Sequence, residues 1–122
     1  MSDNDFMGLF FPEELVKKIE IREITPCAIE ADGIKFIAQA DNTLEKVLPI
    51  IFLTISNAKY SEKIGCLTYK KEQRISTIFA TGRLTLTHVK DRQLADKLVE
   101  DLRGLINRSY SYYKMHGVPS QH

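Results

Sequence analysis

The sequence predicts an α+β fold in which an antiparallel β-sheet has helices packed on one of its faces. Residues 74–80 and 83–89 are rich in the β-branched and apolar residues that strands favour. A three-residue turn that ends at Gly82 joins them, and glycine adopts the left-handed conformation that such a turn requires. A preceding strand at 63–71 and a long amphipathic helix after residue 90 complete the pattern.

The predicted hairpin has two different faces, because side chains alternate along a strand. One face is mainly apolar and carries Ser76, Ile78, Leu84 and Leu86. The other face mixes threonines with apolar and basic residues and carries Ile75, Thr77, Phe79, Arg83, Thr85 and Thr87.

The helix after the hairpin begins near Asp91, a residue suited to the N-cap. Its apolar residues recur at spacings of three and four and are Leu94, Leu98, Val99, Leu102, Leu105 and Ile106. This stripe is expected to cover the apolar face of the hairpin and to leave the threonine-rich face open. An open face with exposed apolar side chains usually meets a partner. Tyr110 and Tyr113 keep the helical spacing, which favours a half-exposed helix end over a base-stacking site.

The N-terminal third predicts a strand at 18–25, interrupted by Pro26 at a bend or at a sheet edge. Asp32-Gly33 is a strong two-residue turn signal, so residues 27–30 and 34–39 are expected to pair as a hairpin. In that register Glu30 lies opposite Lys35, and Ile29 lies opposite Phe36.

Residues 44–56 are apolar nearly all round and too few to cross a bilayer. They predict a buried helix that Pro49 kinks or restarts and that stops at Asn57. A strand at 50–55 is the competing interpretation, because that segment contains several β-branched residues.

Composition sets the remaining bounds. The 122 residues suit a single domain, predicted at 15–114, with an N-terminal arm at 1–14 and a tail at 115–122. The net charge of +1 provides no overall basic field. The arm lacks the pattern of a secretory signal, so a cytoplasmic location is expected. Cys27 and Cys66 are interpreted as buried thiols that pair only if the fold brings them together.

No catalytic constellation is evident. His88 is expected on the helix-facing side of its strand as a structural histidine, and Cys66 has no spacing that links it to a base. Gly82 lies in a hairpin and not in a phosphate-binding loop. We therefore expect no enzymatic activity, no cofactor, no metal site and no small-molecule substrate.

Four segments resemble, in their order, one repeat of the TATA-box-binding protein family. They are N-A-K-Y at 57–60, L-T-Y at 67–69, I-F-A-T-G-R at 78–83 and L-T-H-V-K before the amphipathic helix. The resemblance implies a TATA-box-binding-protein-like half with an extra N-terminal hairpin. It also implies that the open sheet face lies in a DNA minor groove, with Phe79 as a wedge, Thr85 and Thr87 at base edges and Arg83 near phosphates.

The sequence departs from the family in two respects. The chain has one repeat where the family has two, although a homodimer would rebuild the pair by symmetry. The first strand also offers Glu20 and Glu23 to the ligand, and carboxylates oppose phosphate. Similar single domains precede iron–sulfur modules in some archaeal proteins, but this chain has no such cysteine set.

Two functions of different classes remain. In the favoured one, the chain is a protein-interaction module that self-associates or docks through the open face or the aromatic arm. In the alternative, a homodimer binds the DNA minor groove. The six residues Ile75, Thr77, Phe79, Arg83, Thr85 and Thr87 form the predicted binding face in both.

Overall fold

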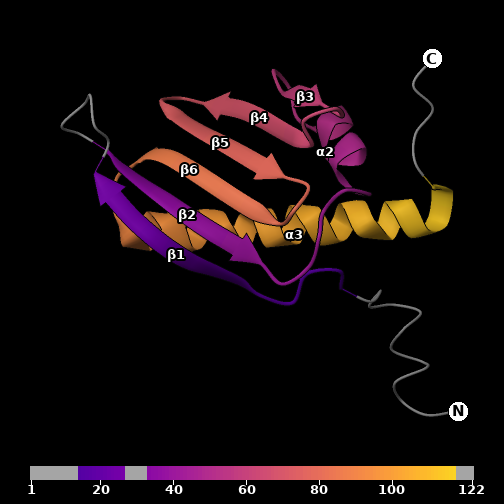
Figure 1. The fold of residues 1–122 in the computed structure, drawn as a ribbon, viewed down its shortest axis with the longest axis horizontal. Coiled ribbons are helices and arrows are strands. Elements are labelled where there is room, and N and C mark those ends of the chain that lie inside the picture. The colour runs from indigo at the N-terminus through magenta and orange to yellow at the C-terminus, as the bar shows by residue number, and fades with distance from the viewer. Residues whose placement is uncertain (1–13, 27–32, 118–122) are drawn as a thin grey trace, which may run out of the picture.

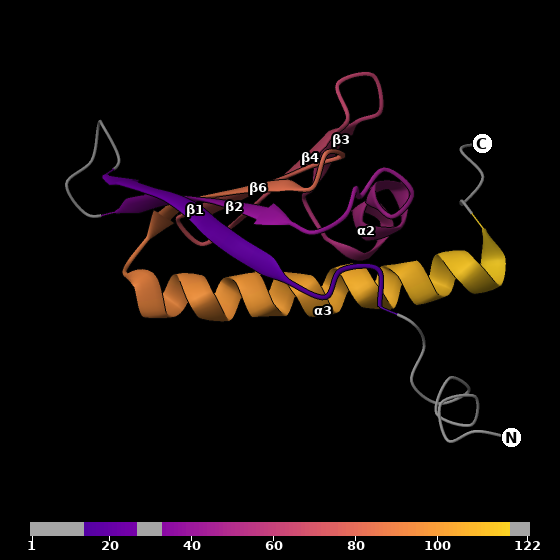
Figure 2. The ribbon, with the colours of Figure 1, turned by 60° about the horizontal axis from the view of Figure 1, so that its bottom comes forward.

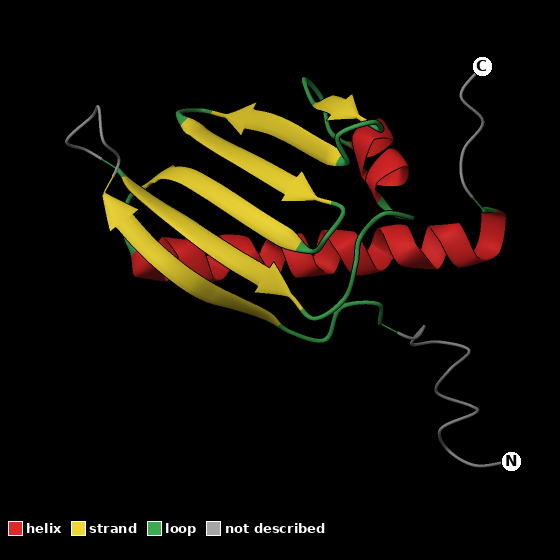
Figure 3. Cartoon of the chain, in the orientation of Figure 1, coloured by secondary structure: helices red, strands yellow, loops and turns green. Residues whose placement is uncertain are grey.

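The computed structural model describes residues 14–26 and 33–117 and contains a six-stranded antiparallel sheet with helices on one side (Figures 1 and 3). The strand order across the sheet is β1-β2-β6-β5-β4-β3. The strands are β1 (Ile19–Pro26), β2 (Ile34–Ala40), β3 (Lys59–Ser61), β4 (Cys66–Lys71), β5 (Arg74–Phe79) and β6 (Arg83–Val89). The helices are α2 (Leu48–Thr54) and α3 (Arg92–His116). The predicted α+β architecture is confirmed.

Both helices lie against the same face of the sheet, as Figure 2 shows. The core between the layers holds fully buried side chains from both, including Phe36, Ile78, Leu84 and Ile106. The predicted apolar face of the hairpin is therefore the covered one.

The β5–β6 hairpin has the predicted strands and turn. Gly82 has a φ of 96°, and a Cβ atom there would lie 2.5 Å from the carbonyl oxygen of Asn42. Two backbone hydrogen bonds hold the turn against the end of β2 and the segment after it, from Ala40 N–H to Gly82 O and from Leu44 N–H to Ala80 O, both 2.8 Å long. Glycine is needed here both for its conformation and for this close approach.

Helix α3 begins as predicted, because the Asp91 carboxylate accepts a hydrogen bond of 2.8 Å from the Leu94 N–H. It continues past the tyrosines to His116, and Gly117 caps it. The buried stripe differs from the prediction: Leu94, Leu98 and Leu105 are half-buried. The buried residues are Ala95, Val99, Leu102, Ile106 and Ser109. The buried stripe therefore includes two small residues, and three of the predicted leucines lie at its margin.

The N-terminal hairpin forms in a register that differs from the prediction. Lys35 pairs with Thr25 and Phe36 pairs with Ile24, so β1 itself is the partner of β2. The predicted pairing of Glu30 with Lys35 and of Ile29 with Phe36 is therefore wrong. Residues 27–32, with Cys27, lie outside the described part of the chain. Strand β1 is at the sheet edge, as the proline at its end suggested.

The apolar segment after β2 forms a buried helix, and the competing strand at 50–55 is wrong. Pro49 lies in the first turn of α2, so it restarts the helix instead of kinking it. Asn57 follows the helix with a φ of 62°. The strand predicted at 63–71 begins only at Cys66, and the short β3 precedes it.

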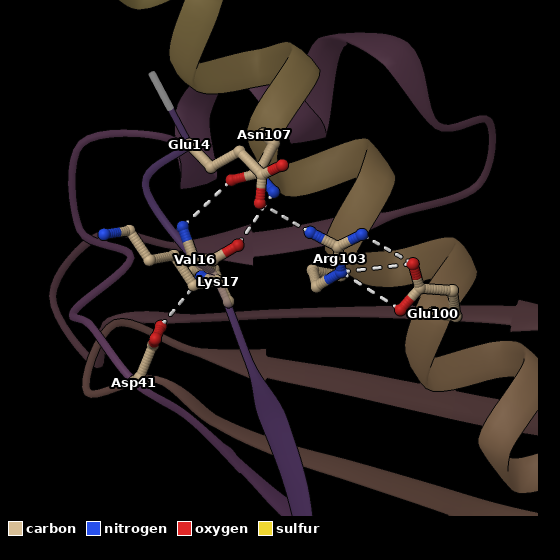
Figure 4. Close-up of polar contacts among 7 residues, drawn as sticks. All are labelled: Glu14, Val16, Lys17, Asp41, Glu100, Arg103 and Asn107. Carbon is tan, nitrogen blue, oxygen red and sulfur yellow. Dashed lines mark hydrogen bonds and ion pairs between the residues drawn. The ribbon is translucent and has the colours of Figure 1, made fainter. Parts of the chain in front are cut away.

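The segment before β1 is fastened to α3 by side chains of that helix (Figure 4). The Asn107 amide accepts from the Val16 N–H at 2.9 Å and donates to the Val16 carbonyl at 2.8 Å. Arg103 forms an ion pair of 2.7 Å with Glu14 and a second with Glu100. The Val16 side chain is completely buried, so the chain enters the sheet from a fixed point on α3.

Candidate binding face

The sheet face opposite α2 and α3 is covered by no element among residues 14–26 and 33–117 (Figures 1 and 2). Strand pairing defines which side chains share it, because directly paired residues point to the same side of an antiparallel sheet. One row crosses the whole face and takes one residue from each strand: Glu23, Ile37, Thr85, Thr77, Thr68 and Lys59. We call this the central row.

The two neighbouring rows have different chemistry. On one side, Glu20 pairs with Gln39 and Gln39 with Arg83, while Phe79 pairs with Cys66. On the other side lie Thr25, Lys35, Thr87, Ile75 and Lys70. The centre of the face is therefore built of threonine, isoleucine and phenylalanine, and the charged residues lie mostly at its margins.

The six residues predicted from the sequence all lie on this face. Ile75 is 36% exposed, Arg83 is exposed, and Thr77, Phe79, Thr85 and Thr87 are half-buried. The Thr77 hydroxyl is 3.2 Å from that of Thr68, and the Thr87 hydroxyl donates to the Ile75 carbonyl. The shared orientation is an observation, and the binding role of these residues remains a prediction.

Sequence reasoning missed the part of the face that β2 and β4 contribute. Lys35, Ile37 and Gln39 alternate with the buried Phe36 and Ala38, a signal that was present in the sequence. The predicted pairing with residues 27–30 placed β2 in a separate hairpin and hid its position between β1 and β6.

The charges on the face are unevenly distributed. Its carboxylates, Glu20 and Glu23, both lie on β1, whereas Lys59 and Lys70 lie on β3 and β4 at the opposite edge. Glu20 is engaged by neighbours: its hydrogen bond with Lys18, 2.8 Å long, lowers the pKa of the carboxyl, and the charges of Lys18 and Arg22 add to this effect. The end of the face near β3 and β4 is consequently basic.

His88 lies at an irregularity of β6 that the sequence did not predict. It has a φ of 60°, and the pairing of β2 with β6 shifts by one residue between Ile34 and Phe36. This bulge turns Val89 into the core, where it is fully buried, and His88 is half-buried. Cys66 is a free, half-buried thiol, so it is less buried than predicted.

No cluster of three or more His, Cys, Asp or Glu side chains with metal-binding geometry occurs within 14–26 and 33–117. In the same ranges, no helix is long and apolar enough to span a membrane.

The fold and its open face define a small α+β domain in which one layer of helices covers one face of the sheet, and no described residue covers the other face. No family model matches the chain, and no curated protein does. Among solved structures, the chain is similar to the Methanococcus jannaschii TBP, with 23% sequence identity and a TM-score of 0.49. The similarity covers 61% of this chain and 44% of that one, so the chain matches less than half of that protein. This similarity concerns the backbone arrangement alone.

Proposed function

We propose that the chain is a non-enzymatic binding module that forms a homodimer through its open sheet face. The observation that carries this proposal is the central row, which has the Glu23 carboxylate at one end and the Lys59 ammonium at the other. Uncharged side chains fill the space between them. When two such rows face each other in opposite directions, the carboxylate of each row lies opposite the ammonium group of the other.

A two-fold axis that lies between two such faces and runs parallel to the strands reverses the strand order of one sheet over the other. Strand β1 of each copy then lies over β3 and β4 of the second copy. Glu23 meets Lys59 of the second copy at both ends of the row, which satisfies the reciprocity of a two-fold interface. A two-fold axis perpendicular to the strands would instead place β1 over β1 and bring like charges together.

The neighbouring rows follow the same reversal. Arg83 approaches the Phe79 ring of the second copy, a cation–π geometry that favours arginine. Lys35 and Lys70 of the two copies also approach each other, but they lie in the outer row, where long aliphatic stems let the ammonium groups extend into water. The attractive contacts are therefore central and the repulsive one is marginal.

The size of the face predicts a reversible dimer. Six strands about 4.8 Å apart and roughly six residues long give a face of about 25 by 20 Å. This corresponds to roughly 500 Å² for each copy, which is below the ~800 Å² of a standard interface. We expect a monomer–dimer equilibrium that depends on protein concentration.

A charge exchange tests the arrangement. Glu23→Lys and Lys59→Glu each replace two attractive pairs with two repulsive ones, which corresponds to about 1–2 kcal/mol or a roughly 5- to 30-fold weaker dimer. The double variant restores attraction with the signs exchanged, so its dissociation constant should return towards that of the wild type. Sedimentation velocity over a concentration series measures this. Glu45→Lys, an exposed change outside the open face, is the matched control.

Three results would refute the dimer. They are a chain that stays monomeric at high concentration, single variants that dimerise like the wild type, and a double variant that dimerises no better than either single one.

The alternative function is minor-groove DNA binding, and the basic residues of the face favour it. Lys35, Lys59, Lys70 and Arg83 outnumber the two β1 carboxylates, one of which is already engaged by Lys18. The same variants distinguish the two functions on an A·T-rich duplex at low salt. DNA binding predicts that Glu23→Lys tightens the complex and Lys59→Glu weakens it, whereas the dimer predicts that both substitutions weaken self-association.

A further inference from the structure

A second surface, on the helical side of the protein, is unrelated to the open face. Two adjoining hollows, each of about 530 Å³, run along one flank of α3 and share Thr54, Leu105 and Arg108 in their walls. Their other wall is formed by α2 at one end and by β4 and β5 at the other. Figure 2 shows α2 lying beside the C-terminal half of α3. We call these hollows together the α3 groove.

The α2 end of the α3 groove is apolar. Leu53 is 67% exposed there and Tyr112 is 48% exposed, although both have large apolar side chains. Ile50 and Leu105 line the same hollow. Exposed apolar side chains that gather around one hollow indicate a surface that another segment covers.

The β4–β5 end of the α3 groove is basic. Lys71 and Arg74 line it, and Arg108 lies where the two hollows meet. The acidic residue in the wall is Asp101, whose carboxylate is 3.0 Å from the Lys97 ammonium group on the same helix. A ligand of this groove must therefore combine apolar side chains with negative charge.

We propose that the α3 groove binds residues 3–11 of the same chain. This segment reads D-N-D-F-M-G-L-F-F and contains neither lysine nor arginine. Its two aspartates match the basic end of the groove, and its five large apolar residues match the apolar end. The same combination makes the segment a poor match for a fully polar surface.

The attachment of the chain to α3 makes this docking geometrically accessible. Val16 and Glu14 are held by Asn107 and Arg103, as Figure 4 shows. Asn107 is two residues from Leu105, which corresponds to about 200° around the helix, so the groove lies on the opposite flank. Thirteen residues extend up to about 43 Å, and a helix with its side chains is about 10–12 Å across. The segment before Glu14 can reach around α3.

Because both ends belong to one molecule, the segment meets the groove at an effective concentration in the millimolar range. Weak contacts then suffice for occupancy. An external peptide with the same acidic and apolar character would have to displace the segment, so the groove is in effect self-blocked.

A double-mutant cycle in the full-length chain tests the proposal. One arm is Phe10→Ser with Phe11→Ser, and the other is Leu53→Ser in the groove wall. Leu53→Ser should lower the Tm of the wild type by a few degrees and leave the Tm of the Phe10→Ser/Phe11→Ser variant unchanged. Ile64→Ser is the matched control, since Ile64 is 73% exposed and lies outside the groove. Its effect should be the same in both backgrounds.

Backbone amide NMR locates the contact. The Phe10→Ser/Phe11→Ser change should move the signals of Leu53, Leu105 and Tyr112 and leave those of Thr77 and Thr85 in place. Additive Tm effects together with unmoved groove signals would overturn the proposal. Signals that move on the open face would overturn it in favour of a segment that covers the sheet. A coupling that disappears on dilution would overturn it in favour of docking onto a second copy.

Discussion

The two hydrogen bonds between the Asn107 side chain and the Val16 backbone, which we call the clamp, provide the sharpest quantitative prediction. The side-chain amide of Asn107 makes one accepted and one donated hydrogen bond with the backbone of Val16, at 2.9 and 2.8 Å. Asn107→Ala removes both, and Asn107→Asp removes the donor while keeping the shape. The two substitutions therefore separate the contribution of the clamp from that of side-chain volume.

The magnitude follows from the two hydrogen bonds. Each contributes about 0.5–1.5 kcal/mol, so Asn107→Ala should reduce the free energy of unfolding by about 2 kcal/mol. For a chain of this length that is a decrease in Tm of roughly 6–10 °C. Asn107→Asp at neutral pH should cost a similar amount, because it loses one bond and places a carboxylate against the Val16 carbonyl oxygen.

The Asn107→Asp variant adds a dependence on pH. When the introduced carboxyl group is protonated, it can again donate to the Val16 carbonyl, so folding raises the pKa of this carboxyl above its unfolded value. Its stabilising contribution is present below the unfolded pKa of about 3.9 and is lost as pH rises through the folded pKa. The difference in unfolding free energy between wild type and Asn107→Asp should therefore shrink as pH falls below about 5.

Urea unfolding monitored by far-ultraviolet circular dichroism at pH 3.5, 5 and 7 measures these differences. Gln93→Glu, an exposed change on the same helix, is the control for the added negative charge and should alter stability by only a few tenths of a kcal/mol. The reasoning is refuted if Asn107→Ala is as stable as the wild type, or if Asn107→Asp keeps its deficit unchanged at low pH.

Three further substitutions test other parts of the fold. Gly82→Ala forces a side chain into a φ of 96° and against the Asn42 carbonyl, so it should lower the free energy of unfolding in urea by about 3 kcal/mol, whereas Gly104→Ala within α3 should be neutral or stabilising; equal effects would contradict the account of the turn. Asp91→Ala should cost about 1 kcal/mol in thermal unfolding by removing the N-cap, and Asp91→Asn should retain most of it. Burial raises the pKa of Tyr69, so its contribution to stability is present below pH ~10 and is lost as pH rises through the folded pKa; absorbance titration should lose a tyrosine step above pH ~10 in Tyr69→Phe, and an unchanged titration in that range would count against this burial.

The regular parts of the fold were predictable because they depend on local signals. The Gly82 turn has a glycine where the backbone requires one, and Asp91 caps a helix with clear periodicity. The buried stripe of α3 was predicted on a rotated face of the helix, because a search for apolar periodicity depends mainly on the large residues. The buried positions include the small residues Ala95 and Ser109, which carry little weight in such a pattern.

The arrangement of β1, β2 and β6 was not predictable from local signals. The turn signal at Asp32-Gly33 favoured a short hairpin, but the pairing of β1 with β2 is set by burial of Phe36 and Ala38 over the helices. Two irregularities, near Arg22 in β1 and at His88 in β6, shift the alternation by one residue. The central row depends on this tertiary pairing. Only the part of the open face that lies on β5 and β6 could therefore be assigned from the sequence.

The two margins of the sheet have a consequence for how copies can join. A strand at an exposed margin offers unpaired backbone groups that can recruit another chain and extend the sheet without limit. Here β3 has only three residues, and β1 carries a bulge, several charged side chains and a terminal proline. Both margins are thereby poor templates for fibre growth. In the proposed dimer, contact between copies uses the broad sheet faces instead, where two-fold pairing closes on itself and assembly would stop at two copies.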